Sequence, residues 1–191
     1  LQRPASPTTV LTCQGMQAMA KENELTWMVV EDDHAIREII QIMCELWQYD
    51  LLAFKDGWEA MAYLNKEETP GPLPQIALLD IRMPGPWGHE ISARIRKHDT
   101  LKDIGIILMT AYDLPGSEEA EYLRSSGADK LIYKPLPPMD VLLETVREVL
   151  ARRASDRITA GTVAKAASPD APKPETVPTA EKVAAEKPAS E

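Results

Sequence analysis

Side chains suited to metal binding and phosphoryl transfer stand at the ends of separate apolar runs of the sequence. They are Glu31, Asp32 and Asp33 after the first run, then Asp80, Thr110 and Lys134 at the ends of three later runs. Carboxylates packed together repel one another, which raises their proton affinity unless a cation intervenes. Oxygen ligands at this density suit Mg²⁺, which keeps several waters and accepts a substrate oxygen. If the fold brings these run ends together, they make a magnesium site.

The same set of residue types suits the transfer of a phosphoryl group. That reaction needs mainly positioning and neutralisation of charge, which a metal ion, the Lys134 ammonium and the Thr110 hydroxyl would supply. A carboxylate can be the nucleophile, and the product is then an acyl phosphate. The residues therefore indicate phosphoryl-transfer chemistry, provided that the elements carrying them converge.

The elements that must position these residues alternate between strand and helix from about residue 25 to 150. Strands are predicted at 26–30, 51–54, 76–79, 104–109 and 130–133, and helices at 36–47, 57–64, 88–97, 117–126 and from 138 onward. Several strands are apolar throughout, which indicates a parallel sheet covered on both faces. Right-handed crossovers then give a doubly wound α/β fold, in which ligands bind beyond the carboxyl ends of the strands.

Four ordered motifs resemble the signatures of the response-regulator receiver family. They are VVEDDHAIR, LLDIRMPGPWG, LMTA and YKPLPP, within roughly residues 25–152, about two thirds of the chain. The resemblance implies a five-stranded parallel sheet in the order 2-1-3-4-5 with five helices. It also implies a two-component signalling phosphoacceptor, not an enzyme, although such a domain assists its own phosphotransfer and autodephosphorylation.

The resemblance assigns a role to each residue of the expected site. Asp80 matches the phosphoacceptor, Thr110 the switch hydroxyl and Lys134 the phosphate-pairing amine. Asp32 would ligate Mg²⁺ directly and Glu31 through water. Asp80 and the backbone carbonyl of Arg82 complete the expected metal ligands, whereas Asp33 is expected to cap the following helix.

The chain departs from the family pattern at Leu131 and at Trp87, which occupies a loop position that is often acidic in the family. Leu131 occupies the position of the usual switch aromatic, and Tyr133 lies two residues further on, hence on the same face of the strand. Whether Tyr133 takes over is left open. Arg82 and Tyr112 flank the expected site, and we expect their bulk to shield the phosphoryl group from water.

Composition gives the expected domain limits. Residues 24–150 hold 23 acidic against 12 basic residues, a poor match to a phosphate backbone, so direct nucleic-acid binding is not expected. The predicted receiver domain spans residues 24–153. Residues 1–23 are predicted to be a disordered extension, and residues 154–191, rich in Ala, Pro, Lys and Glu, a disordered tail or linker.

The remaining residue types indicate a cytoplasmic protein. Cys13 and Cys44 are predicted to be free thiols in a reducing compartment. No apolar run approaches the roughly 20 residues that cross a bilayer. The three histidines, His34, His89 and His98, show no metal-binding spacing and are predicted to be surface residues.

The resemblance implies partners and leaves two functional hypotheses. The phosphoryl donor would be a sensor histidine kinase or a histidine phosphotransfer protein. Phosphorylation would switch the face of the fourth helix, fifth strand and last helix toward an effector protein; dimerisation on activation is left open. The chain is either a stand-alone phosphoacceptor or the input half of a longer regulator, whose DNA-binding or enzymatic output domain lies beyond residue 191. A flavin-binding relative is disfavoured, because acids replace a phosphate-binding loop after the first strand.

Overall fold

The computed structural model describes residues 25–66 and 71–166. The strands are β1 (Thr26–Val30), β2 (Asp50–Phe54), β3 (Ile76–Asp80), β4 (Gly105–Thr110) and β5 (Lys130–Tyr133). The helices are α2 (His34–Trp47), α3 (Gly57–Leu64), α4 (Gly88–Ile95), α5 (Gly116–Ser126) and α6 (Met139–Ala166). The extension predicted for residues 1–23 lies outside the described residues, as does Cys13.

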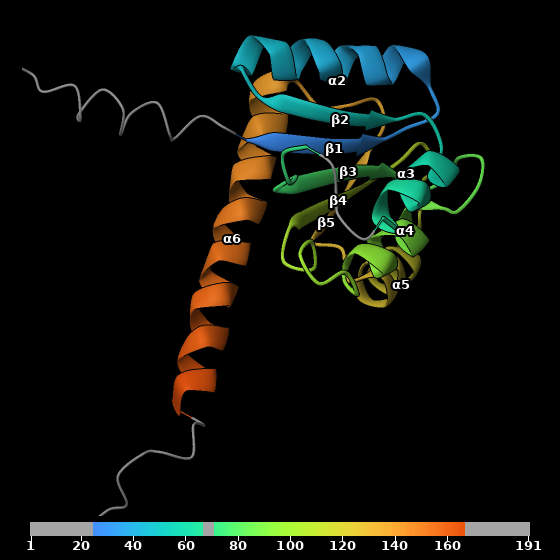
Figure 1. Cartoon of the computed structure of the whole chain (residues 1–191). Coiled ribbons are helices and arrows are strands. Elements are labelled where there is room, and N and C mark those ends of the chain that lie inside the picture. Colours follow the sequence, from blue (N-terminus) through green and yellow to red (C-terminus); the bar gives the residue numbers. More distant parts are fainter. Residues whose placement is uncertain (1–24, 67–70, 167–191) are drawn as a thin grey trace, which may run out of the picture.

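All five strands are parallel and lie in the order β2-β1-β3-β4-β5, which confirms the predicted topology. Helices α2 and α6 cover one face, and α3, α4 and α5 cover the other (Figure 1). Successive β1 side chains alternate between the two cores: Met28 and Val30 pack with α3 and α4, and Trp27 and Val29 with α2 and α6. The three central strands β1, β3 and β4 are buried along their whole length, as their continuous apolar sequences predicted.

Short local signals set the helix ends that surround the strand tips. The Asp33 carboxylate accepts hydrogen bonds from the backbone N–H groups of Ala35 and Ile36, at 2.8 and 3.3 Å, and so caps α2 as predicted. At the start of α4, a Cβ on Gly88 would lie 2.2 Å from the carbonyl oxygen of Asp80. A side chain at position 88 would therefore push α4 off the end of β3.

Helix α2 buries a narrower stripe than its apolar sequence suggests. Ile40, Met43 and Cys44 are buried, but Ile39 and Leu46 are 47% and 66% exposed. Cys44 is a free thiol whose pKa burial raises to about 12. The exposed residues lie on the face of α2 that points away from the sheet.

Helix α6 corrects the predicted start of the tail. It continues to Ala166, so the disorder predicted from residue 154 is wrong for residues 154–166. The sequence has no proline between Met139 and Pro169, and extending a helix that is already formed costs little compared with nucleating one. Residues 167–191 lie outside the described part of the chain. No helix within the described residues is both long and apolar enough to cross a bilayer.

Candidate functional site

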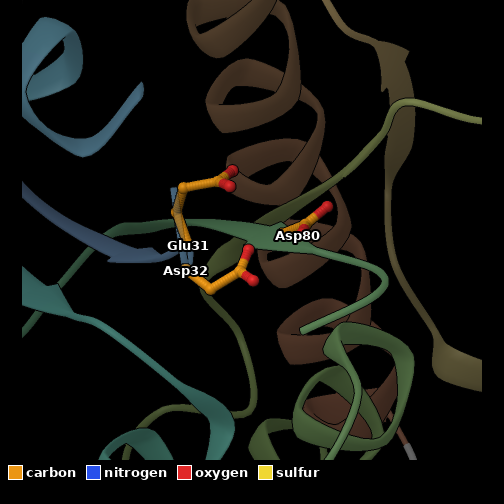
Figure 2. A group of neighbouring side chains, drawn as sticks. All are labelled: Glu31, Asp32 and Asp80. Carbon is orange, nitrogen blue, oxygen red and sulfur yellow. The ribbon is translucent and has the colours of Figure 1, made fainter. Parts of the chain in front are cut away.

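Three carboxylates meet at the carboxyl ends of β1 and β3. Glu31 directly follows β1, Asp32 comes next, and Asp80 is the last residue of the neighbouring strand β3. One oxygen from each carboxylate lies within 4.8 Å of the others, and the three side chains point into a common space (Figure 2). Glu31 is fully buried, Asp80 is buried, and Asp32 is exposed. The fold thus gathers the predicted acidic residues from separate stretches of chain.

The Lys134 ammonium lies among these carboxylates. Its Nζ is 2.7 Å from Oε2 of Glu31 and 3.0 Å from Oδ1 of Asp80. Lys134 directly follows β5 and precedes Pro135 through a cis peptide bond. One ammonium faces three carboxylates, so this end of the sheet keeps an excess of negative charge.

The titration behaviour of these groups follows from their burial and mutual contacts. Burial raises the pKa values of both Glu31 and Asp80 above their ordinary values, and the hydrogen bonds from Lys134 oppose this rise. For Lys134 itself, burial lowers the pKa, but its hydrogen bonds to Glu31 and Asp80 outweigh burial and raise it overall. Lys134 is therefore a firmly protonated cation, whereas each buried carboxylate would be stabilised by further positive charge.

Backbone contacts fix the acidic turn after β1. Arg37, one turn into α2, donates from Nη1 to the carbonyl oxygens of Glu31 at 2.7 Å and Asp32 at 2.8 Å. The backbone N–H of Arg82 donates to the Asp80 carboxylate. No contact of Arg37 was predicted, although a basic residue one turn after the acidic pair is the signal that would have found it. These bonds hold the carboxylates in place without neutralising any of them.

Thr110 lies buried at the end of β4, adjacent to both β3 and β5. Its hydroxyl accepts a hydrogen bond from the backbone N–H of Tyr112 at 3.1 Å, and its carbonyl accepts one from the N–H of Lys134 at 2.7 Å. Leu131 is buried in the core, whereas Tyr133 is exposed and its hydroxyl donates to Glu119 of α5 at 3.1 Å. At the position of the expected switch aromatic, the structure thus has a packed aliphatic residue.

The carboxylates open onto a pocket of about 550 Å³. Its wall includes Arg82 and Tyr112, and the Arg82 guanidinium carbon lies 4.2 Å from the centroid of the Tyr112 ring. Carboxylate oxygens, excess negative charge and an open mouth are what a hard divalent cation requires, so these residues fit Mg²⁺. Within the part of the chain that the structure describes, no other group of three potential ligand residues lies this close together.

Comparison with known proteins points to one family. The family described as response regulator receiver domain matches residues 27–147. The phosphate regulon transcriptional regulatory protein PhoB of Pseudomonas aeruginosa is 31% identical over 128 residues, which are 66% of this chain and 52% of PhoB. The polar-differentiation response regulator DivK of Brucella anthropi is 27% identical over 123 residues, which are 64% of this chain and 94% of DivK.

Solved structures give the same result for the fold. The CheY-like response regulator receiver domain protein of Methanospirillum hungatei superposes with a TM-score of 0.59 at 26% identity, covering 70% of this chain and 98% of that one. The chain thus spans about half the length of PhoB but nearly all of DivK and of the Methanospirillum protein.

Proposed function

Because the chain belongs to the response regulator receiver family of two-component systems, we propose that it accepts a phosphoryl group from a phosphohistidine onto Asp80. One observation carries the proposal: the Asp80 carboxylate stands at the mouth of an acidic pocket with the Lys134 ammonium 3.0 Å away. A helix-capping or purely structural aspartate would not need an open pocket, two further carboxylates and an ammonium around it.

The proposed transfer is a displacement at phosphorus, in which the Asp80 carboxylate replaces the imidazole of the phosphohistidine. A carboxylate oxygen of Asp80 attacks phosphorus, the phosphorus–nitrogen bond of the phosphohistidine breaks, and the imidazole leaves with the electron pair. The Lys134 ammonium, beside Oδ1 of Asp80, is placed to pair with the incoming phosphoryl oxygens. The backbone N–H of Arg82 orients the attacking carboxylate.

We assign the metal ligands as follows. Asp32, Asp80 and the backbone carbonyl of Arg82 would hold Mg²⁺ directly, and Glu31 through water. When bound, the ion supplies positive charge to the phosphoryl oxygens and relieves repulsion among the carboxylates. The protein's own part is to hold these oxygens in position, through Arg37 at the acidic turn and Gly88 packed against the end of β3.

The donor would dock on α2. Ile36 lines the pocket, and Ile39, Ile42 and Leu46 extend an apolar stripe from there along the exposed face of the helix. The last three are 47%, 49% and 66% exposed. An apolar stripe that runs from the reacting carboxylate suits a sensor histidine kinase or histidine phosphotransfer protein that must bring its phosphohistidine to Asp80.

Labelling with a small phosphoryl donor tests the proposed acceptor. Incubation with acetyl phosphate and Mg²⁺ is expected to add one phosphoryl group to the wild type, seen by mass spectrometry. Asp80→Asn should abolish the addition. Asp56→Asn is the matched control, because Asp56 caps α3 away from the pocket and should leave labelling intact. Equal labelling of wild type and Asp80→Asn would place the acceptor elsewhere.

The match to PhoB supports a second form of the proposal, in which the chain is the input half of a longer regulator. The chain covers 52% of PhoB, which is named as a transcriptional regulatory protein, but 94% of DivK. The downstream reading frame decides between a regulator with an output domain beyond residue 191 and a receiver that acts by binding an effector protein.

A further inference from the structure

A row of contacting side chains runs from the rim of the Asp80 pocket to helix α5. The Arg82 guanidinium carbon lies 4.2 Å from the ring centroid of Tyr112 and 5.7 Å from that of Trp87. The Trp87 ring in turn meets His89 at 5.7 Å between centroids. His89 then meets Tyr122 of α5 at 5.2 Å. The row therefore links the pocket to α5 across the start of α4.

The ring contacts in this row depend on the angle between the ring planes. His89 meets Trp87 and Tyr122 nearly edge to face, with interplanar angles of 73° and 71°. The buried Nδ1 of His89 has no hydrogen-bond partner among the described residues. His89, which is half-buried, thus packs from α4 against α5 with an aromatic ring on either side. A change in the orientation of the Trp87 ring would therefore alter the packing of His89 and, through it, that of Tyr122.

The usual place for a rotating aromatic offers no such connection in this chain. Leu131 stands there and is packed in the core beneath α5. Tyr133 on the edge strand contacts α5 through the hydrogen bond from its hydroxyl to Glu119. The contact of Tyr133 with α5 is therefore separate from the row that begins at Arg82.

We propose that phosphorylation of Asp80 is transmitted to α5 through Arg82, Trp87, His89 and Tyr122. The inference rests on the proposed function. An acyl phosphate carries up to two negative charges where the carboxylate carried one, so it draws the Arg82 guanidinium from the Tyr112 and Trp87 rings toward the pocket. The Trp87 ring then repacks against His89, and the contact of His89 with Tyr122 changes with it.

The test follows the ring-proton NMR signals of His89 and Tyr122 while acetyl phosphate and Mg²⁺ are added, with phosphoryl incorporation measured in parallel by mass spectrometry. In the wild type both signals should shift as the phosphoryl group is added. Trp87→Leu should be labelled to the same extent but lose at least half of both shifts. Trp87→Phe, which keeps a ring at this position, should recover them.

Trp58→Leu is the matched control. Trp58 of α3 is also an exposed aromatic residue, and its ring covers Gly85, which lies in the same loop as Trp87, but Trp58 is not part of the row. It should respond as the wild type does. The proposal is overturned if Trp87→Leu keeps its shifts, if Trp58→Leu loses them equally, or if only Tyr133→Phe abolishes them. A labelled wild type with unchanged His89 and Tyr122 signals refutes the row alone, whereas an unlabelled wild type refutes the proposed function.

Discussion

The two ends of the sheet both gather buried ionic side chains, but with opposite balances of charge. At the carboxyl end, three carboxylates lie together, and the single ammonium of Lys134 pairs with two of them, Glu31 and Asp80. At the amino end, the buried Asp129 carboxylate pairs with three arginines, Arg96, Arg152 and Arg153.

The two ends also differ in what is left to bind. Asp129 accepts a further hydrogen bond from the backbone N–H of Ile106 at 2.9 Å, so its oxygens are fully used. Arg96 also donates to the carbonyl oxygens of Gly127, Lys102 and Ile104. The carboxylates at the other end keep uncompensated charge and open onto a pocket. Burial of ions is common to both ends; charge imbalance at an open mouth distinguishes the candidate site from the structural cluster.

Removing the buried acid from the amino end should have the largest effect on stability. Asp129→Ala leaves Arg96 and Arg153 unpaired in a largely buried setting, and we expect it to lower the free energy of unfolding by about 3–5 kcal/mol. Urea denaturation measures this change. The control Arg152→Ala removes a side chain that is 61% exposed and should cost under about 1 kcal/mol. A loss for Asp129→Ala no larger than the control's would contradict a structural role for the cluster.

Adding Mg²⁺ should stabilise the protein through the carboxyl end alone. At a concentration ten times its dissociation constant, a ligand that binds only the folded state adds about 1.4 kcal/mol to the free energy of unfolding. Asp32→Asn should lose most of this gain. Asp33→Asn should keep it, because Asp33 caps α2 and asparagine caps equally well. Thermal melts with and without the ion measure the difference; a gain unaffected by Asp32→Asn would remove the ion from this site.

Without metal, Asp80→Asn should stabilise the protein by roughly 1 kcal/mol at neutral pH, because it removes one member of a repelling carboxylate group. Burial raises the pKa of Asp80 above 3.8, so the folded protein binds a proton more readily than the unfolded chain does. As pH rises from 3.8 through the folded-state pKa of Asp80, ionisation of this carboxyl group lowers the free energy of unfolding of the wild type. The advantage of the variant should therefore be full at neutral pH and vanish in acid. Melts in EDTA across this range test the sign.

The smallest effect concerns how open the acidic pocket is to water. Tyr112 is 53% exposed and stacks on Arg82 at the pocket wall. The Tyr112 ring forms part of the pocket wall, so Tyr112→Ala should open the pocket to water and speed autodephosphorylation about two- to fivefold, which corresponds to a barrier lowered by about 0.5–1 kcal/mol. Loss of the phosphoryl group with time, after removal of acetyl phosphate, gives the rate. Trp58→Ala, an exposed aromatic outside the pocket, should leave the rate unchanged, and an unchanged rate in Tyr112→Ala would argue against shielding.

The fold could be predicted because its signals are local. Each of these signals occupies a few consecutive residues, as the apolar strands, the helix cap at Asp33 and the helix end at Gly127 show. Once the strand ends were predicted, Asp80 and Lys134 were expected to be neighbours. The topology rule for parallel sheets converts these separate positions into one edge. The predicted strand order depended on the family resemblance, which the comparisons support.

What could not be predicted depends on partners distant in sequence. Arg96 and Arg153 lie 33 and 24 residues from Asp129, and no spacing along the chain marks the three as one cluster. The ring contact of His89 could not be predicted, because its partner Tyr122 belongs to another helix. The length of α6 was missed for another reason: the average composition of residues 154–191 concealed a proline-free beginning that continues the helix.

The arginine cluster also fixes the point from which the end of α6 projects. Arg152 and Arg153 tie the helix to Asp129 at the amino end of the sheet, and its orange-red end projects past the rest of the described chain (Figure 1). The turns from 154 to 166 extend about 20 Å from that point, at about 1.5 Å per residue. A tilt of about 10° at that point would move the tip by about 3 Å. A small change in the tilt of α6 at Asp129 would therefore give a larger displacement at the end of the helix. That end lies by the amino ends of the strands, away from Asp80 at their carboxyl ends.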